Sequence, residues 1–183
     1  MSAMHARSRR RLVALALSLV LSLDAATALA KGGAFADFAG TFVGRGVAKT
    51  TDGAKEVLSC RATGASAGEG RALSQNIACE SATFKFDLSG LIVAEGAEAR
   101  GQWRETTRGL AGDVSGRIVG PRFSGVSAVK GFAGRFSFHV GPRKLIFAFW
   151  PDDANMPRLR LSLDREDRED QKQRRPRGLI LLY

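Results

Sequence analysis

The sequence VLSCRATGASAGEGRALSQNIACES, residues 57–81, holds both cysteines of the chain and decides how its first strands pair. Apolar and polar residues alternate on either side of a glycine-rich centre, which is typical of half-buried β-strands. The alternation predicts a β-hairpin with its loop in GASAGEGR, residues 64–71. One face of this hairpin carries Leu58, Cys60, Ala62, Leu73, Gln75, Ile77 and Cys79.

The two cysteines are expected to form a disulfide. A register that pairs Cys60 with Cys79 also pairs Ala62 with Ile77, so both pairs share the apolar face. Directly opposed Cβ atoms of an antiparallel pair lie at about the separation that a disulfide spans. A redox pair favours the closer CxxC spacing, and a zinc site needs further Cys or His ligands. Apart from the two cysteines, His139 is the one Cys or His ligand beyond residue 30. We therefore expect neither a metal nor a cofactor.

Short alternating runs continue through the chain as far as Leu163. Turn residues such as Ser89-Gly90 and Gly141-Pro142 separate these runs, and no run keeps a helical period. The pattern predicts an all-β fold of about 8–10 strands, either a single antiparallel up-and-down β-barrel (lipocalin-like) or a β-sandwich. The many glycines inside the strands favour the barrel, because glycine relieves crowding where a sheet bends sharply.

The two ends of the chain differ in character from this body. Four arginines precede the apolar run LVALALSLVLSL, and the exit Ala28-Leu29-Ala30 predicts a signal peptide, residues 1–30. An uncleaved anchor is the alternative, although the apolar run is shorter than the ~20 residues of a membrane span. We expect a β-barrel domain over residues 31–163 and a charged tail over 164–183 that ends in the apolar hexapeptide GLILLY. The mature protein would then be periplasmic or secreted, with no transmembrane segment.

The chain is basic, with 28 Lys and Arg against 18 Asp and Glu and a net charge of +10. Removal of the signal peptide would take away four arginines and Asp24, which leaves a net charge of +7. A basic excess favours contact with anionic surfaces. An anionic envelope surface is therefore a candidate partner, with improved solubility as the alternative explanation, and a nucleic-acid partner is not expected.

No catalytic constellation is recognisable. His139 alternates outward from its strand, and the chain has no GxSxG elbow that would support a Ser-His-Asp arrangement. The carboxylate pairs Asp152-Asp153 and Glu95/Glu98 fall at expected turns. We therefore expect no enzyme activity and no catalytic residues.

Aromatic residues form a stripe on two successive runs joined at Gly141-Pro142. Pairing the runs as a hairpin opposes Phe136 to Phe147 and Phe138 to Leu145. The rings could fill a core or line a cavity for an apolar ligand, because barrels of about eight or more strands can enclose one. The candidate ligand contacts are Trp103, Phe136, Phe138, Phe147, Phe149, Arg104, Arg108, Arg117 and Arg135.

Three segments, FAGTFVGRG, the cysteine hairpin and GQWRE, carry a resemblance to a family of uncharacterised secreted two-cysteine β-domain proteins of alphaproteobacteria. The resemblance covers roughly residues 38–165, and the matching positions are Phe38, Gly40, Phe42, Gly44, Cys60, Cys79, Gly101, Trp103, Glu105 and Arg165. It supports the β fold and implies no activity. The opening segment also resembles, faintly, the first strand of lipocalin-like barrels, with Phe42 in place of their tryptophan.

Taken together, these patterns predict a non-catalytic exported binding or interaction protein whose ligand is apolar or anionic. The alternative is an envelope structural or inhibitor-like protein that acts through its outer surface and has a filled core.

Overall fold

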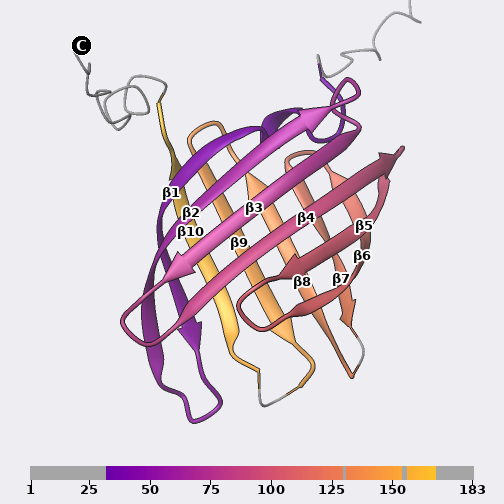
Figure 1. The fold of residues 1–183 in the computed structure, drawn as a ribbon. Helices are drawn as coiled ribbons and strands as arrows, with labels where there is room; N and C mark the ends of the chain where they lie inside the picture. Colours follow the sequence, from indigo (N-terminus) through magenta and orange to yellow (C-terminus); the bar gives the residue numbers. More distant parts are fainter. Residues whose placement is uncertain (1–31, 130, 154–155, 168–183) are drawn as a thin grey trace, which may run out of the picture. The chain divides into compact units, whose positions relative to one another are not determined.

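A computed structural model describes residues 32–129, 131–153 and 156–167. The expected signal peptide and most of the expected tail lie outside these residues. The described chain forms a closed barrel of ten antiparallel strands, in which each strand pairs with the next and β1 pairs with β10 (Figure 1). The strands are β1 (Gly40–Lys49), β2 (Lys55–Ala67), β3 (Ala72–Glu80), β4 (Lys85–Glu95), β5 (Glu98–Glu105), β6 (Leu110–Val119), β7 (Arg122–Val129), β8 (Phe132–Val140), β9 (Lys144–Pro151) and β10 (Arg158–Arg165).

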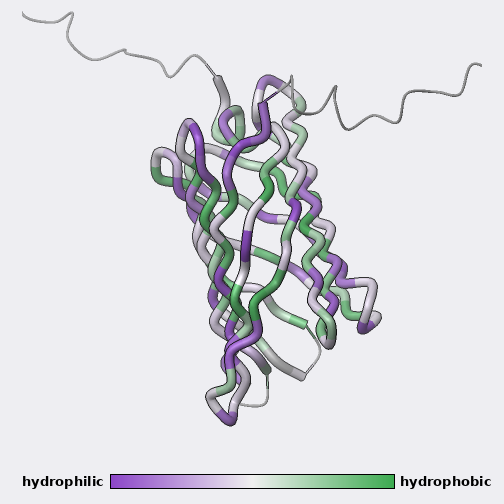
Figure 2. Tube along the Cα trace, turned by 90° about the vertical axis from the view of Figure 1, so that its left-hand side faces the viewer, coloured by the Kyte–Doolittle hydropathy of each residue, from purple (hydrophilic) through white to green (hydrophobic). Residues whose placement is uncertain are grey.

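The barrel prediction is confirmed, and the sandwich alternative is wrong. Alternate residues of each strand point to the interior, and Figure 2 shows the resulting alternation of hydrophilic and hydrophobic residues along the chain. Glycine permits close approach where the barrel closes. A Cβ added at Gly46 in β1 would lie 2.4 Å from Cδ2 of Leu161 in β10 and 3.0 Å from Sγ of Cys60 in β2.

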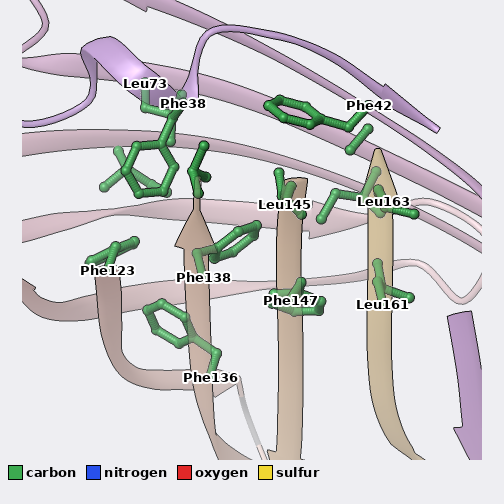
Figure 3. Close-up of a cluster of buried hydrophobic side chains, with 14 of the residues drawn as sticks. Phe38, Phe42, Leu73, Phe123, Phe136, Phe138, Leu145, Phe147, Leu161 and Leu163 are labelled. Carbon is green, nitrogen blue, oxygen red and sulfur yellow. The ribbon is translucent and has the colours of Figure 1, made fainter. Parts of the chain in front are cut away.

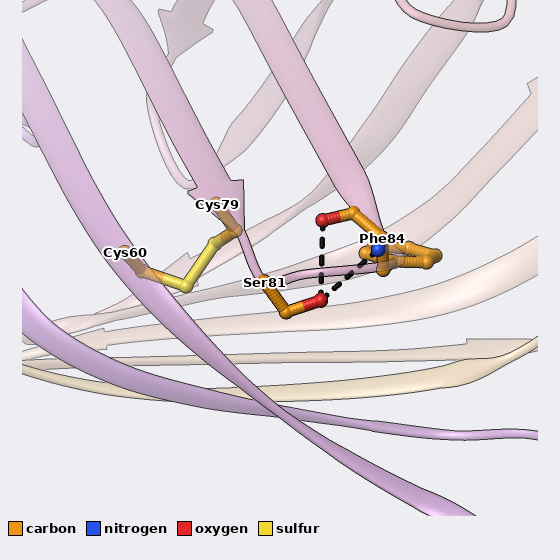
Figure 4. The surroundings of a disulfide bond; sticks show 4 residues. All are labelled: Cys60, Cys79, Ser81 and Phe84. Carbon is orange, nitrogen blue, oxygen red and sulfur yellow. Dashed lines mark hydrogen bonds between the residues drawn. A yellow bond between two sulfur atoms is a disulfide. The ribbon is translucent and has the colours of Figure 1, made fainter.

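The cysteine hairpin has the expected register. Cys60 opposes Cys79 and Ala62 opposes Ile77, and the disulfide prediction is confirmed (Figure 4). The Cα atoms of the cysteines are 4.1 Å apart, just below the usual lower limit of about 4.4 Å. The strands extend further than predicted, because the turn needs only residues 68–71, where Gly68, Glu69 and Gly70 all have positive φ.

The second predicted hairpin has a different register from the expected one. Phe136 opposes Phe149 and Phe138 opposes Phe147, so the pairing is shifted by two residues. The reason is the turn, which uses residues 141–144 and closes with a hydrogen bond from Gly141 N–H to the Lys144 carbonyl. Because the shift is an even number of residues, the same side chains still point inward.

A short N-terminal segment covers one end of the barrel. Its 3₁₀-helix η1 (Ala36–Phe38) ends in Phe38 and is preceded by Phe35, and both of these rings are buried. The Phe35 N–H donates to the Gly70 carbonyl at 2.8 Å, and the Phe35 ring packs edge-on against Phe123, with 5.7 Å between centroids. The segment therefore supplies part of the core that the strands alone would leave uncovered.

Arg165, at the end of β10, fastens this segment. Its guanidinium donates hydrogen bonds to the carbonyls of Asp37, Ala39 and Pro142 at 2.9, 2.7 and 2.9 Å and stacks on the Phe42 ring at 4.4 Å. We call this set of contacts the Arg165 clamp.

The barrel extends beyond the expected boundary at residue 163. Strand β10 continues to Arg165. Glu166 is buried and pairs with Arg61 of β2 at 2.7 Å. The first residues of the expected tail therefore belong to the barrel, because they make contacts with strands that are distant in sequence.

Candidate functional site

The interior holds an apolar cavity of about 140 Å³. Phe42 of β1 and Leu161 and Leu163 of β10 belong to the filled part of the core, whereas aromatic rings dominate the lining of the cavity. The aromatic residues that line the cavity are Phe84, Phe86, Trp103, Phe123, Phe136, Phe138, Phe147 and Phe149. The cavity reaches the barrel end opposite η1, because residues of the loops there, Arg108, Met156 and Pro157, also border it.

The rings of β7, β8 and β9 form one wall of this cavity. The Phe123 and Phe136 centroids are 4.9 Å apart in an edge-on contact, and Phe138 lies 4.5 Å from Phe147 (Figure 3). Such contacts orient each ring through its neighbours. The orientation of each ring in this wall is therefore fixed by its neighbours.

Two polar groups in the lining have no hydrogen-bond partner among the described residues: the Oε1 acceptor of Gln75 and the Nε1 donor of Trp103. Gln75 is only 3% exposed, and its Nε2 donates to the carbonyls of Thr63 and Asn76. Buried polar atoms are normally paired. Two of the residues that line the cavity thus carry an unpaired buried acceptor and an unpaired buried donor.

Gly90 of β4 lies between these two polar residues, since it pairs with Gln75 on one side and with Trp103 on the other. A Cβ added at Gly90 would meet only the Gln102 carbonyl at 3.5 Å and the Trp103 Cβ at 3.9 Å, which are ordinary contacts. The position therefore has room for a side chain, and glycine leaves that room to the cavity.

Glu105 is a buried carboxylate that lines the cavity near the barrel end opposite η1. It accepts hydrogen bonds from the Thr107 hydroxyl and from the backbone N–H groups of Asp87, Thr107 and Arg108. Burial raises its pKa, but these hydrogen bonds outweigh burial and hold the pKa below its usual value. The carboxylate organises the β5–β6 turn that carries Arg108, whose guanidinium stacks on Phe84 at 4.6 Å.

We expect Glu105→Gln to lower the free energy of unfolding at pH 7 by about 1–3 kcal/mol, because a buried amide cannot replace the charged acceptor. A lowered pKa in the folded state stabilises the protein above the unfolded-state pKa of about 4.3, and this stability is lost as the pH falls through the folded value. The variant should therefore lose less stability than the wild type below about pH 4.3. Urea unfolding between pH 7 and pH 3 measures this. If the free energy of unfolding depends on pH equally in both proteins, the prediction is wrong. Glu98→Gln, at an exposed position, serves as the control.

The structure separates the candidate ligand contacts into two groups. Trp103 and the four phenylalanines of β8 and β9 line the cavity, and Arg108 borders it. Arg104, Arg117 and Arg135 are exposed on the outer face, where Arg117 pairs with Glu98 at 2.6 Å. Their positions in the strand alternation could have shown this, because each alternates with an inward residue.

Gln75 and Gly90 are among the cavity-lining residues that were not candidates. Gln75 was expected on the inner face, and a lone polar residue in an apolar alternation is the signal that could have marked it. Gly90 was expected in a turn with Ser89, but it lies inside β4, so that expectation is wrong. Glycine inside a strand has several structural causes, so Gly90 gave no signal of a cavity.

Other chemistry is not evident in the described part of the chain. Residues 32–129, 131–153 and 156–167 contain no group of three or more His, Cys, Asp or Glu that could hold a metal ion. His139 is half-buried on the outer face, and its Nδ1 has no hydrogen-bond partner among the described residues. None of the described helices has the length and apolar character needed to cross a membrane.

Comparison with known proteins identifies the fold alone. The chain matches no protein-family model, and no curated protein sequence matches it. Among solved structures it is similar to Rv2717c from M. tuberculosis, with a TM-score of 0.58 and 13% identity over 73% of this chain and 96% of that one. At this identity the similarity supports the barrel architecture.

Proposed function

We propose that the protein is a non-catalytic exported binding protein that holds a small apolar ligand inside its barrel. The observation that carries the proposal is the cavity of about 140 Å³ lined by aromatic rings. An engineered apolar cavity of about 150 Å³ in another protein stays dry and binds benzene or xenon. A ligand with one aromatic ring, or an aliphatic group of similar size, therefore matches this interior.

The unused donor and acceptor suggest that the ligand carries a small polar group. A hydroxyl both donates and accepts, so it could meet the Gln75 Oε1 acceptor or the Trp103 Nε1 donor. A site that hydrogen-bonds a ligand group rejects analogues that lack the group. Phenol should accordingly bind more tightly than benzene.

Gly90→Leu is expected to abolish binding while leaving the barrel folded. An added Cβ makes only ordinary contacts at this position, which lines the cavity, so we expect leucine to extend into it. Filling a cavity with apolar atoms commonly stabilises a core. Calorimetric titration of wild type and variant with benzene and with phenol measures the effect. We expect at least tenfold weaker binding of both compounds and an unchanged or higher melting temperature for the variant.

Ser89→Leu is the matched control, since it adds the same side chain one residue away on the outer face, where binding should not change. Unaltered benzene and phenol affinity in Gly90→Leu would rule out an internal site. Native mass spectrometry of the protein purified from its own envelope would then show whether a ligand is carried elsewhere.

Export and family membership belong to this proposal. The buried disulfide supports an oxidising location outside the cytoplasm, as the signal-like N-terminus does. The two-cysteine β-domain family of alphaproteobacteria remains a resemblance. N-terminal sequencing of the envelope form should begin at Lys31, and an intact N-terminus would count against the predicted cleavage.

A further inference from the structure

The charges of the barrel are divided between its two halves. Strands β7 to β10 and β1, which are neighbours around the barrel, contain eight basic residues and one acidic residue. Strands β2 to β6 contain six basic and seven acidic residues. The strand charge is therefore +7 on one half and −1 on the other, although the sequence shows only a general basic excess.

The basic half presents its charges to solvent. Arg165 is used in the clamp, and the other basic side chains of these strands are exposed: Arg45, Lys49, Arg122, Arg135, Lys144, Arg158 and Arg160. Among the described residues only Lys144 of this set forms an ion pair, with Asp164 at 3.1 Å. Six exposed cations thus lack an ion-pair partner within the described chain, whereas Arg61 and Arg117 of the other half are paired.

An exposed tryptophan lies within this basic half. Trp150 of β9 is 38% exposed and pairs across the outer face with Arg135 of β8, which in turn pairs with Val126 of β7. Val126 is 49% exposed. A row of apolar, cationic and aromatic side chains therefore crosses three neighbouring strands.

We propose that the outer face of β7 to β10 and β1, called here the basic face, docks on a bilayer surface that contains anionic lipids. Lys and Arg near such a surface are attracted by the lipid phosphates. Tryptophan favours the headgroup level, because its ring is apolar and its N–H needs a polar partner. A hydrated polysaccharide or a nucleic-acid backbone satisfies the charges equally well, but it offers no interfacial layer for Trp150 and Val126. The inference is independent of the cavity ligand.

The test compares two charge-matched variants. Arg135→Glu/Arg160→Glu changes the basic face, and Arg100→Glu/Arg104→Glu makes the same change in net charge on β5. All four arginines are exposed and lack an ion-pair partner within the described residues. Wild type and variants are expressed from the same gene and purified in the same way, so any processing of their termini is the same. Binding is measured by co-sedimentation with phosphatidylglycerol/phosphatidylcholine vesicles and with pure phosphatidylcholine vesicles.

We expect the wild type to bind the anionic vesicles, to bind pure phosphatidylcholine weakly and to dissociate as salt rises. The basic-face variant should bind roughly tenfold or more weakly, since each cation contributes separately near the surface. The β5 variant should bind nearly as the wild type does. Equal losses in the two variants would overturn the proposal, because they would mean that only net charge matters.

Trp150→Ala distinguishes a lipid layer from a general polyanion. It should weaken vesicle binding several-fold and leave retention on immobilised dextran sulfate unchanged. Unchanged vesicle binding by Trp150→Ala, or retention on dextran sulfate by a wild type that does not bind vesicles, would overturn the assignment to lipid. Circular dichroism of each variant confirms that the fold is intact.

Discussion

Replacing Arg165 with methionine is expected to lower the free energy of unfolding by about 3 kcal/mol. The guanidinium donates to three carbonyls, in the N-terminal segment and in the β8–β9 turn, and stacks on Phe42. Hydrogen bonds to a charged group are worth about 1.5–3 kcal/mol each, and part of the loss is recovered when water reaches the carbonyls. Methionine keeps much of the apolar stem, so the effect reports mainly on the charged head. Urea unfolding measures it.

Arg160→Met is the matched control on the same strand. Its side chain is exposed and has no ion-pair partner within the described residues, so the expected change is below about 0.5 kcal/mol. The clamp also predicts a local signature. Amide exchange of Phe35 should quicken in Arg165→Met, because its hydrogen bond to Gly70 depends on the segment staying docked. Equal stability of the two variants would show that the clamp adds nothing.

Replacing both Cys60 and Cys79 with alanine should lower the free energy of unfolding by a similar amount, about 3 kcal/mol. The disulfide links residues separated by 19 positions, and the chain-entropy model assigns about 3 kcal/mol to a loop of this size. The fold should survive, because the buried apolar cluster extends through all ten strands and does not depend on the sulfurs. A loss of 3 kcal/mol corresponds to a fall of roughly 6–12 °C in melting temperature.

Reductant provides the control for this prediction. The sulfurs are buried, with Cys60 4% and Cys79 2% exposed, so the wild type should be reduced in denaturant and refolded before melting. Reduction should then lower the melting temperature of the wild type and leave the double variant unchanged. If both proteins melt alike with and without reductant, the disulfide is not a stabilising crosslink.

Local sequence patterns anticipated the hairpin around the cysteines more accurately than the later one. In the first hairpin, the two sulfurs require one register, and the apolar alternation agrees with it. In the second, Phe136 had inward partners at both Phe147 and Phe149, and alternation cannot distinguish registers that differ by two. The turn length decided between them, and it depends on how Pro142 and its neighbours close the loop.

The sequence predicted the aromatic lining of the candidate site but not its full set of residues. Aromatic residues on β8 and β9 share one face by alternation, so their convergence could be foreseen. Arginines were chosen by charge alone, and of the four only Arg108 borders the cavity. Gly90 and Gln75 contribute through what lies across the strand from them, which composition and spacing do not show.

The sequence by itself determined the all-β character, the inward and outward faces of the strands and the disulfide, because these follow from alternation and from short loops. Only the tertiary structure decided that the sheet closes through β1 and β10, that the core leaves a cavity beside Trp103, and that Arg165 fastens the N-terminal segment. The physical reason is contact order. The barrel closure and the Arg165 clamp join residues more than a hundred positions apart, as in the bond from Arg165 to Ala39. No local pattern specifies which distant strands become neighbours.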